Sequence, residues 1–371
     1  MTERVLITYE DSGVDYSVLD VLKLKAQQAA AATAHNLEQN FGLAEVAESR
    51  GESAYVWDDG DEYGAIVTEG LGTKNLVADA MREITGKTYY DVVAQDTVAM
   101  IVNDLITVGA LPKVITAHFS VGESNWFNDQ RRAQDLINGW RQACILAGAV
   151  WGPGETSTLK GILKPAAMEL SGSAIGEIYP KERLMFGSRL QPNDAIILLS
   201  SSGVHASGLT LAGEVVAGRL PEGYATRLKD GSMYGESLLV PTLIYVDALK
   251  GLFATGVQPH YAVNITGHGW RKLMRADREL SYLINRISEP QPVFNLIQAY
   301  SGSSDREMYS NFNMGAGFAF FVAPEQAEFA TEQIKRAGYG AFIAGSVQAG
   351  PKRVIIEPKN ITFEAETLQV R

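Results

Sequence analysis

The chain has 371 residues, two to three times the ~100–150 residues of a typical domain, which favours two domains. Hydrophobic residues make up 46% of the sequence and charged residues 20%, a globular composition that excludes disordered and fibrous proteins. The formal net charge of −11 argues against nucleic-acid and anionic-membrane partners, and the short basic runs Arg131–Arg132 and Arg271–Lys272 are interpreted as solvated surface.

The single cysteine indicates the cellular compartment. Cys144 has no partner for an intramolecular disulfide, and its apolar surroundings predict a buried thiol without a catalytic role. No apolar stretch is long enough to cross a membrane, and the first residues lack the pattern of a signal peptide. The sequence therefore predicts a cytoplasmic protein.

The first half of the chain is predicted as a mixture of helices and strands. Apolar residues recur at helical spacing in an Ala-, Gln- and Lys-rich run, which predicts one helix over 16–39. A mostly buried helix is expected over 91–108 and another over 129–146. Strands are expected at 65–67 and 114–119, and 166–178 resembles a strand broken by serine and glycine.

The texture of the sequence changes near residue 180. Polar, turn-forming segments at 179–183 and 190–194 place a domain boundary there, giving domains 1–178 and 179–371. After it we expect a strand at 195–199, a helix from about residue 209, a glycine-rich turn at 264–269 before another helix, a strand at 318–322 and a loose tail over 359–371.

Several common catalytic motifs are absent. The sequence has no phosphate-binding P-loop, no Gly-x-Gly-x-x-Gly after a first strand, no His-Glu-x-x-His and no Gly-x-Ser-x-Gly. P-loop ATPases, nicotinamide oxidoreductases, zinc proteases and α/β-hydrolases therefore lose their usual support.

A glycine-rich segment over Thr68–Lys74 is the first candidate site. Gly70 and Gly72 allow backbone amides to approach a phosphate, Lys74 supplies positive charge, and the Glu69 carboxylate could hold a divalent cation. The alternative is an ordinary turn with an exposed lysine.

The helix over 91–108 carries the second candidate site. At ~100° per residue, Asn103 returns to within ~20° of Asp96, and Asp104 lies ~80° away. Two carboxylates on one side of an otherwise apolar helix favour a bound cation. The alternative is helix capping or ion pairing with basic residues elsewhere.

A longer pattern follows at the end of this helix. Asp104–Pro112 has the form Asp-x4-Gly-Ala-x-Pro. It resembles the signature of the ATP-binding superfamily that includes aminoimidazole ribonucleotide synthetase, selenophosphate synthetase, thiamine-monophosphate kinase, the hydrogenase-maturation dehydratase and formylglycinamide ribonucleotide amidotransferase.

The closest resemblance is to the aminoimidazole ribonucleotide synthetase family, also called phosphoribosylformylglycinamidine cyclo-ligase. It runs in order through almost the whole chain. Thr68–Lys74, for example, resembles the family's Thr-Asp-Gly-Val-Gly-Thr-Lys. The matching segments are Tyr9–Asp15, Thr68–Lys74, Asp96–Asp104, Gly154–Thr156, Ser201–His205, Asn264–Gly267 and Glu307–Gly315.

The resemblance implies an α+β, two-domain fold. The N-terminal domain would bind ATP and form a homodimer in which strands of both subunits close a β-barrel backed by helices, and an α/β C-terminal domain would bind substrate. The implied cofactors are ATP and Mg²⁺. The implied metal ligands are Glu69, Asp96 and Asp104, the implied nucleotide contacts are Gly70, Gly72, Thr73, Lys74, Asn103, Gly109 and Thr156, and the candidate catalytic residues are His205, Glu155 and Lys74.

The implied reaction is the ATP-dependent cyclisation of formylglycinamidine ribonucleotide to aminoimidazole ribonucleotide in purine biosynthesis. Departures from the family pattern at Glu69, Ser157–Gly161 and His268 leave open a paralogous kinase or phosphotransferase with another small substrate. A nucleotide-binding subunit without activity is a third hypothesis. For His205 and Glu155, purely structural roles are the alternatives.

Overall fold

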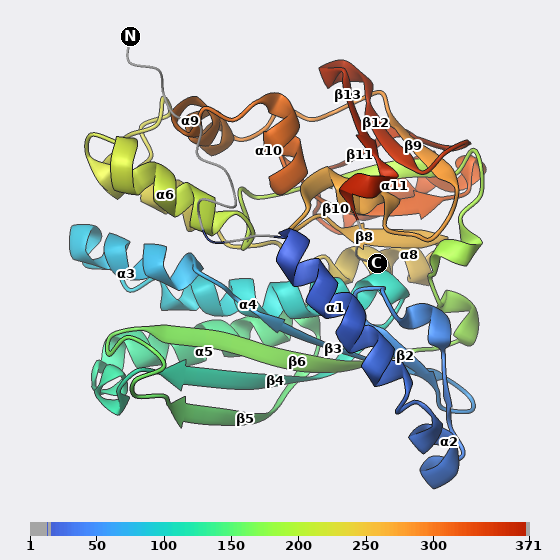
Figure 1. Cartoon of the computed structure of the whole chain (residues 1–371), viewed down its shortest axis with the longest axis horizontal. Coiled ribbons are helices and arrows are strands. Elements are labelled where there is room, and N and C mark those ends of the chain that lie inside the picture. Colours follow the sequence, from blue (N-terminus) through green and yellow to red (C-terminus); the bar gives the residue numbers. More distant parts are fainter. Residues whose placement is uncertain (1–12, 14–15, 369–371) are drawn as a thin grey trace.

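The computed structural model describes residue 13 and residues 16–368 of the chain. These residues form two mixed sheets, one on each side of residue 178, and both carry helices (Figure 1). The predicted α+β class is confirmed. The matching segment Tyr9–Asp15 lies outside the described residues except for Gly13.

The N-terminal sheet has six strands in the order β1-β2-β3-β6-β4-β5. Its neighbours are antiparallel except for the parallel pair β4 and β5. The strands are β1 (Ala44–Glu45), β2 (Tyr55–Asp58), β3 (Tyr63–Gly70), β4 (Leu111–Val121), β5 (Val150–Thr158) and β6 (Met168–Ile178).

Strand β6 is continuous, which corrects the expectation of a broken strand. Its glycines serve close packing instead of ending the strand, because a Cβ at Gly172 would lie 2.3 Å from the carbonyl oxygen of Thr116. Gly176 meets the carbonyl oxygen of Leu111 in the same way, at 2.6 Å. Both glycines therefore let β6 pair with β4.

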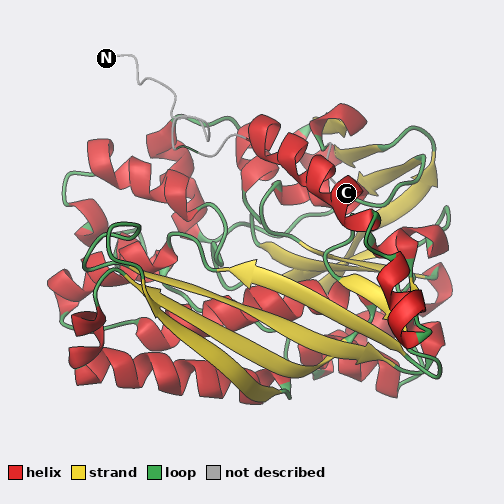
Figure 2. Ribbon diagram, turned by 60° about the horizontal axis from the view of Figure 1, so that its bottom comes forward, coloured by secondary structure: helices red, strands yellow, loops and turns green. Residues whose placement is uncertain are grey.

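Helices cover one face of this sheet. Figure 2 shows its long strands lying in front of the helices, with the opposite face uncovered. Helices α4 (Tyr90–Leu105) and α5 (Gln130–Ala147) pack on its strands, and α3 (Lys74–Thr85) packs against α4. The predictions of helices at 91–108 and 129–146 are confirmed, although residues Ile106–Val108 form a 3₁₀ turn.

The expected single helix over 16–39 is two helices, α1 (Tyr16–Ala31) and α2 (His35–Phe41). Side chains hold the turn between them. The Thr33 hydroxyl donates to the carbonyl oxygen of Ala30, and Nδ1 of His35 lies 2.9 Å from the carbonyl oxygen of Ala32. Such local bonds compete with the backbone ladder of a helix.

The C-terminal sheet has seven strands in the order β13-β12-β9-β11-β7-β10-β8, and only β12 and β9 are parallel. Its strands are β7 (Ala195–Ser200), β8 (Tyr261–Asn264), β9 (Leu280–Ile284), β10 (Ala316–Val322), β11 (Ala341–Ala349), β12 (Arg353–Ile356) and β13 (Ile361–Glu364). The accompanying helices are α6 (Leu209–Arg219), α7 (Tyr234–Leu238), α8 (Val246–Ala254), α9 (Pro292–Ser301), α10 (Asp305–Asn311) and α11 (Ala327–Arg336).

The predicted strands at 195–199 and 318–322 and the helix from 209 are confirmed. The helix expected after the 264–269 turn is a 3₁₀ helix, Gly269–Met274. The expected loose tail is wrong for 361–364, because β13 pairs with β12 there. Its alternating burial, with Ile361 and Phe363 inside, supplies the reason.

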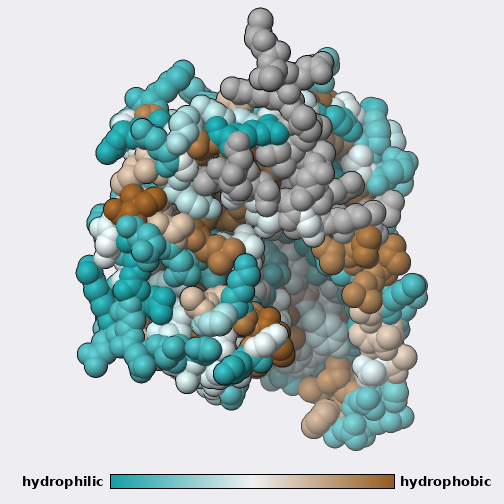
Figure 3. Space-filling view, turned by 60° about the vertical axis from the view of Figure 1, so that its left-hand side comes forward, coloured by the Kyte–Doolittle hydropathy of each residue, from teal (hydrophilic) through white to brown (hydrophobic). Residues whose placement is uncertain are grey.

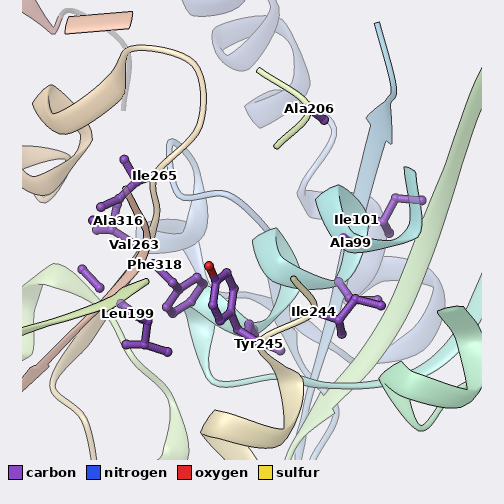
Figure 4. Close-up of a cluster of buried hydrophobic side chains, with 14 of the residues drawn as sticks. Ala99, Ile101, Leu199, Ala206, Ile244, Tyr245, Val263, Ile265, Ala316 and Phe318 are labelled. Carbon is purple, nitrogen blue, oxygen red and sulfur yellow. The ribbon is translucent and has the colours of Figure 1, made fainter. Parts of the chain in front are cut away.

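The hydrophobic core continues from one sheet to the other through α4. Figure 4 shows Ala99 and Ile101 of α4 beside Ile244, with Tyr245 and Phe318 beyond it. The rings of Tyr245 and Phe318 lie 5.3 Å apart, and the Tyr245 hydroxyl donates to the carbonyl oxygen of Ser200. Helix α4 is therefore packed against both parts of the chain.

On the face that Figure 3 shows, the described side chains are mostly polar, and the apolar ones lie in separate patches. Helix α1 carries exposed Val18 and Leu22. No described helix is both long enough and apolar enough to span a membrane. The Cys144 thiol is buried as expected, and burial raises its pKa to about 12.

Candidate functional site

A cavity of about 620 Å³ lies where α1, the N-terminal sheet, α4 and the C-terminal part meet. Glu69 at the end of β3, Asp104 at the end of α4 and Glu52 before β2 provide its acidic side chains on the N-terminal side. On the C-terminal side, the cavity is lined by residues of the 266–275 segment. Both sheets are therefore required to form it.

The carboxyls of Glu69 and Asp104 lie close enough to influence each other. Strand alternation places Glu69 on the same face as buried Val67, the face toward α4. Burial, followed by the negative charge of Asp104, raises the pKa of Glu69 to about 8, although Lys272 and Arg275 oppose the shift. Two carboxyls in this position can share a proton or hold a cation.

Asp104 is fixed by a residue of the other sheet. The side-chain amide of Asn264, at the end of β8, donates to Oδ1 of Asp104 over 2.6 Å. Both side chains are buried. An uncharged amide therefore orients the carboxylate.

Basic side chains surround the two carboxyls. Lys23 comes from α1, Arg50 from the loop before β2, and Lys272 and Arg275 from the 269–274 turn and the residue after it. Arg275 also donates to the carbonyl oxygen of Gly51 and to the Ser53 hydroxyl, which ties the two parts of the chain together. A wall of this kind suits a ligand with several negative charges.

The interpretation of Arg271–Lys272 as solvated surface is wrong. Lys272 lines the cavity and donates to the Thr266 hydroxyl, and burial lowers its pKa. Arg271 donates to the carbonyl oxygens of Ser310 and Thr367. The turn after β8 directs both side chains toward the interior. Two adjacent basic residues in a sequence do not indicate this orientation.

A histidine of the cavity wall, His268, contacts helix α1. His268 has a positive φ of 67°, and its Nε2 lies 3.4 Å from Oδ2 of Asp20 on α1. Burial, assisted by neighbouring cations, lowers the pKa of His268 to about 3. The imidazole is therefore neutral at physiological pH, and its contact with Asp20 is not an ion pair.

The structure divides the three polar residues of α4 that were expected to share one site. Asp104 lines the cavity, whereas Asp96 is fully buried and paired with Lys74 at 2.8 Å. Asn103 binds the backbone of Leu243 and Tyr245. The ~80° between Asp96 and Asp104 is enough to turn them to different surroundings.

The glycine-rich segment after β3 is only partly open. Gly72 has a φ of 76° and open space around its Cα, and the hydroxyl of Thr73 lies 3.2 Å from that of Thr210. Gly70 lies against the Glu169 side chain. Gly109 is far from open, because a Cβ there would lie 2.0 Å from the carbonyl oxygen of Arg183.

Glu155 and Thr156 do not line the cavity. They lie in β5, the edge strand of the N-terminal sheet, opposite His118 and Phe119 of β4, and both side chains are exposed. Strands β4 and β6 separate β5 from β3, which carries Glu69. Within the chain these residues are therefore set apart from the carboxyls of Glu69 and Asp104.

His205 is held inside the C-terminal part. It has a φ of 63°, and its Nε2 accepts a hydrogen bond from the backbone N–H of Ser202. Burial, followed by the charge of Lys74, lowers the pKa of the imidazole to about 3. A neutral acceptor in a tight turn fits the structural alternative for this residue.

Sequence reasoning missed most of the basic wall. Lys23, Arg50 and Arg275 lie far apart in the sequence and in segments without a motif. For Lys272 and Arg275, the sequence feature that could have indicated a role in the site is the glycine-rich turn at 264–269, which comes shortly before them.

Two family models match the chain. AIR synthase related protein, N-terminal domain, matches residues 51–178, and AIR synthase related protein, C-terminal domain, matches residues 191–357. Phosphoribosylformylglycinamidine cyclo-ligase of Methanococcus maripaludis is 31% identical over 345 residues, which cover 92% of this chain and 93% of that protein. The enzyme of the same name from Methanothermobacter thermautotrophicus is 32% identical over 324 residues, covering 87% and 90%. A solved structure, AaThiL complexed with AMPPCP and TMP, has a TM-score of 0.57 at 15% identity and covers 85% of this chain and 90% of that chain, which shows a shared fold.

Proposed function

Because this chain belongs to the AIR synthase related family, we propose that it is a phosphoribosylformylglycinamidine cyclo-ligase. It cyclises formylglycinamidine ribonucleotide to aminoimidazole ribonucleotide with consumption of ATP, a step of purine biosynthesis. Identity at this level over almost the full length of relatives that carry this name supports the assignment. The observation that carries it is the pair of carboxyls, Glu69 and Asp104, inside a basic cavity.

The cavity is the proposed site for the polyphosphate of ATP. Its volume lies in the range of ligand sites, and Lys23, Arg50, Lys272 and Arg275 complement a triphosphate. The related fold of AaThiL was solved with AMPPCP, an ATP analogue, which supports nucleotide binding by this architecture.

Glu69 and Asp104 fit a magnesium ion. Mg²⁺ is commonly held by one or two carboxylates together with substrate phosphates and water, and both carboxyls here face the basic cavity. Burial, followed by the negative charge of Asp104, raises the pKa of Glu69, and a bound cation would favour its ionised form. When bound, the ion neutralises charge on the phosphate oxygens.

The reaction asks mainly for positioning. The γ-phosphoryl group of ATP passes to the amide oxygen of the substrate, the amidine nitrogen then attacks that carbon, and phosphate leaves as the ring closes. Lys272 and Arg275 would hold the transferred group, and Asn264 keeps Asp104 oriented toward it. His205 is neutral and enclosed, so its proposed role is to shape the turn that includes Ser207 at the cavity wall.

A homodimer with a shared barrel is part of the proposal. The N-terminal sheet has one uncovered face, and its edge strand β5 begins with exposed Val150, features that a second subunit would cover. Glu155 and Thr156 lie on that edge, where contact with the other subunit could bring them to a site. A cytoplasmic location accords with the single buried thiol of Cys144.

The test is direct turnover. Purified protein is incubated with ATP, Mg²⁺ and formylglycinamidine ribonucleotide, and aminoimidazole ribonucleotide and ADP are measured together. We expect equal amounts of the two. ADP formed with another phosphate acceptor, but no ring product with this substrate, would instead identify a paralogous phosphotransferase, and ATP binding without any turnover would identify the non-catalytic alternative.

A further inference from the structure

We propose that the buried ion pair of Lys74 and Asp96, through the bonds of both residues to the C-terminal part of the chain, acts as an interdomain strut that sets the spacing of the two cavity walls, and that neither residue contacts ATP. The inference rests on the proposed function only for its kinetic readout. It assigns to both residues a positioning role in place of the phosphate and metal contacts that the sequence pattern implied.

The Lys74 ammonium is surrounded by acceptors. Its Nζ lies 2.8 Å from Oδ2 of Asp96 and donates to the carbonyl oxygens of His205 and Val240 at 3.1 and 3.0 Å. Two hydrogen bonds and one ion-pair contact match the three N–H donors of an ammonium group, so a phosphate would have to replace one of these acceptors. Both side chains of the pair are 0% exposed, which also denies them a ligand in the cavity.

Asp96 is equally occupied. Its Oδ1 accepts from both the backbone N–H and the hydroxyl of Thr242, in addition to the contact of Oδ2 with Lys74. Burial raises the pKa of Asp96 and lowers that of Lys74, while the charge of each partner opposes both shifts. A metal ion at Asp96 would have to displace Lys74 from Oδ2 or Thr242 from Oδ1.

The strut joins the two parts of the chain. Lys74 begins α3 and Asp96 lies in α4, whereas Val240 and Thr242 belong to the segment between α7 and α8. Two further side chains of α4 bind the same segment. Gln95 donates to the carbonyl oxygen of Thr242, and Asn103 bonds Leu243 and Tyr245. The 240–245 segment is therefore fastened along α4 by side chains.

This fastening reaches both walls of the cavity. On the N-terminal side, Asp104 lies on the same helix, eight residues or about 12 Å beyond Asp96. On the C-terminal side, the turn whose carbonyl Lys74 binds at His205 continues to Ser207, which lines the cavity. A change at the strut would shift both walls relative to each other.

The cost of the pair supports a geometric role. Removing two charges from water is expensive, and replacing a buried pair by apolar residues is often neutral or stabilising. A pair kept for stability alone would have no advantage over such residues. A fixed separation between α3, α4 and the 240–245 segment is what three directional contacts of Lys74 supply.

The test compares Lys74→Met, Asp96→Leu and the double variant with Lys23→Met, which removes a lysine that lines the cavity. ATP affinity is measured by calorimetry, stability by thermal unfolding, and kcat by turnover. We expect both single variants to unfold at lower temperature and to lose at least about tenfold in kcat, with ATP affinity within about threefold of wild type. The double variant should be more stable than either single variant, because no unpaired buried charge remains, but it should not regain kcat. Lys23→Met should weaken ATP binding at least about tenfold without a loss of stability.

The single variants could misfold, so the test also includes a milder variant and a measurement that does not depend on enzymatic activity. Thr242→Val removes one hydrogen bond to Asp96. Hydrogen exchange is measured at the backbone N–H of Tyr245, which donates to Asn103 and not to Lys74 or Asp96. We expect faster exchange at Tyr245 in Thr242→Val and in the double variant. Unchanged exchange, or a double variant that regains both stability and kcat, would overturn the positioning role.

Direct phosphate contact by Lys74 has its own signature. Lys74→Met would then weaken ATP binding as Lys23→Met does, while Asp96→Leu would not, and this result also overturns the inference. Because ATP affinity, unfolding and exchange need no product, they decide the matter even where the turnover assay shows no ring closure.

Discussion

Asn264 donates through its side-chain amide to Oδ1 of Asp104 over 2.6 Å, and this bond links the end of β8 to the end of α4. It is the contact through which the C-terminal sheet orients a carboxylate of the N-terminal part. An amide does not titrate, so the donor to Asp104 is unchanged across the physiological pH range.

Asn264→Leu should remove the donor and leave Oδ1 of Asp104 without it in a buried site. We expect the free energy of unfolding to fall by about 1–3 kcal/mol and the Mg²⁺ concentration needed for half-maximal activity to rise. Urea unfolding and a magnesium titration measure these. Asn40→Leu, on the exposed end of α2, is the control and should change neither quantity. An unchanged magnesium requirement in Asn264→Leu would contradict the role given to this bond.

The raised pKa of Glu69 predicts a pH-dependent stability. Below pH 4.5 both the folded and the unfolded states keep its proton, whereas from pH 4.5 to about 8 only the folded state keeps it. Its contribution to the free energy of unfolding is therefore fully present below pH 4.5 and is lost as pH rises through 8. Glu69→Gln should remove this slope, and Glu83→Gln on the exposed side of α3 should not. Parallel pH curves for wild type and Glu69→Gln would refute the assignment.

Lys272→Met should weaken ATP binding, because the variant removes a cation from the cavity. We expect the dissociation constant to rise about 10- to 100-fold at low salt, and the difference from wild type to shrink as salt screens the remaining charges. Calorimetry at two salt concentrations measures both effects. Lys87→Met, at an exposed position after α3, serves as control. Equal affinity in the two variants would place the triphosphate elsewhere.

Gly109→Ala should be strongly destabilising. The φ of Gly109 is 89°, and a Cβ there meets the carbonyl oxygen of Arg183 at 2.0 Å, so strain and a clash combine to about 2–5 kcal/mol. Gly86→Ala has a similar φ of 75° with open space and should cost only about 1–2 kcal/mol. Denaturant unfolding of the two variants separates the cost of backbone strain from the cost of the clash with Arg183. Equal losses would show that the contact with Arg183 adds nothing.

The sequence predicted those parts of the fold whose local pattern agrees with their packing. The strand at 195–199 and the helix over 91–108 follow from hydrophobic periodicity. The break after Ala31 was missed because it depends on the side chains of Thr33 and His35, which compete with the helix over a single turn. The continuity of β6 was missed because its glycines are required by close packing against the neighbouring strand β4, which the local sequence does not show.

The sequence predicted which acidic residues belong to the candidate site, but it did not predict which residues contact them. Glu69 and Asp104 stand in recognisable motifs, and they do line one cavity. Asp96 was assigned to the same site because helix geometry relates it to Asn103, but its partner Thr242 comes from 146 residues further along the chain. Spacing within one helix reports which side chains share a direction, and it carries no information on what a distant segment places there.

Strand β13 has a consequence for the order in which the protein can form. Leu368, shortly after this strand, lines the cavity, and Arg271 beside the cavity binds the carbonyl oxygen of Thr367. A ribosome releases these residues last among those described, long after Glu69 and Asp104 have emerged. The nascent N-terminal half must therefore carry its two neighbouring acids without their enclosing wall, and translation has to run almost to the end of the described chain before the pocket can close.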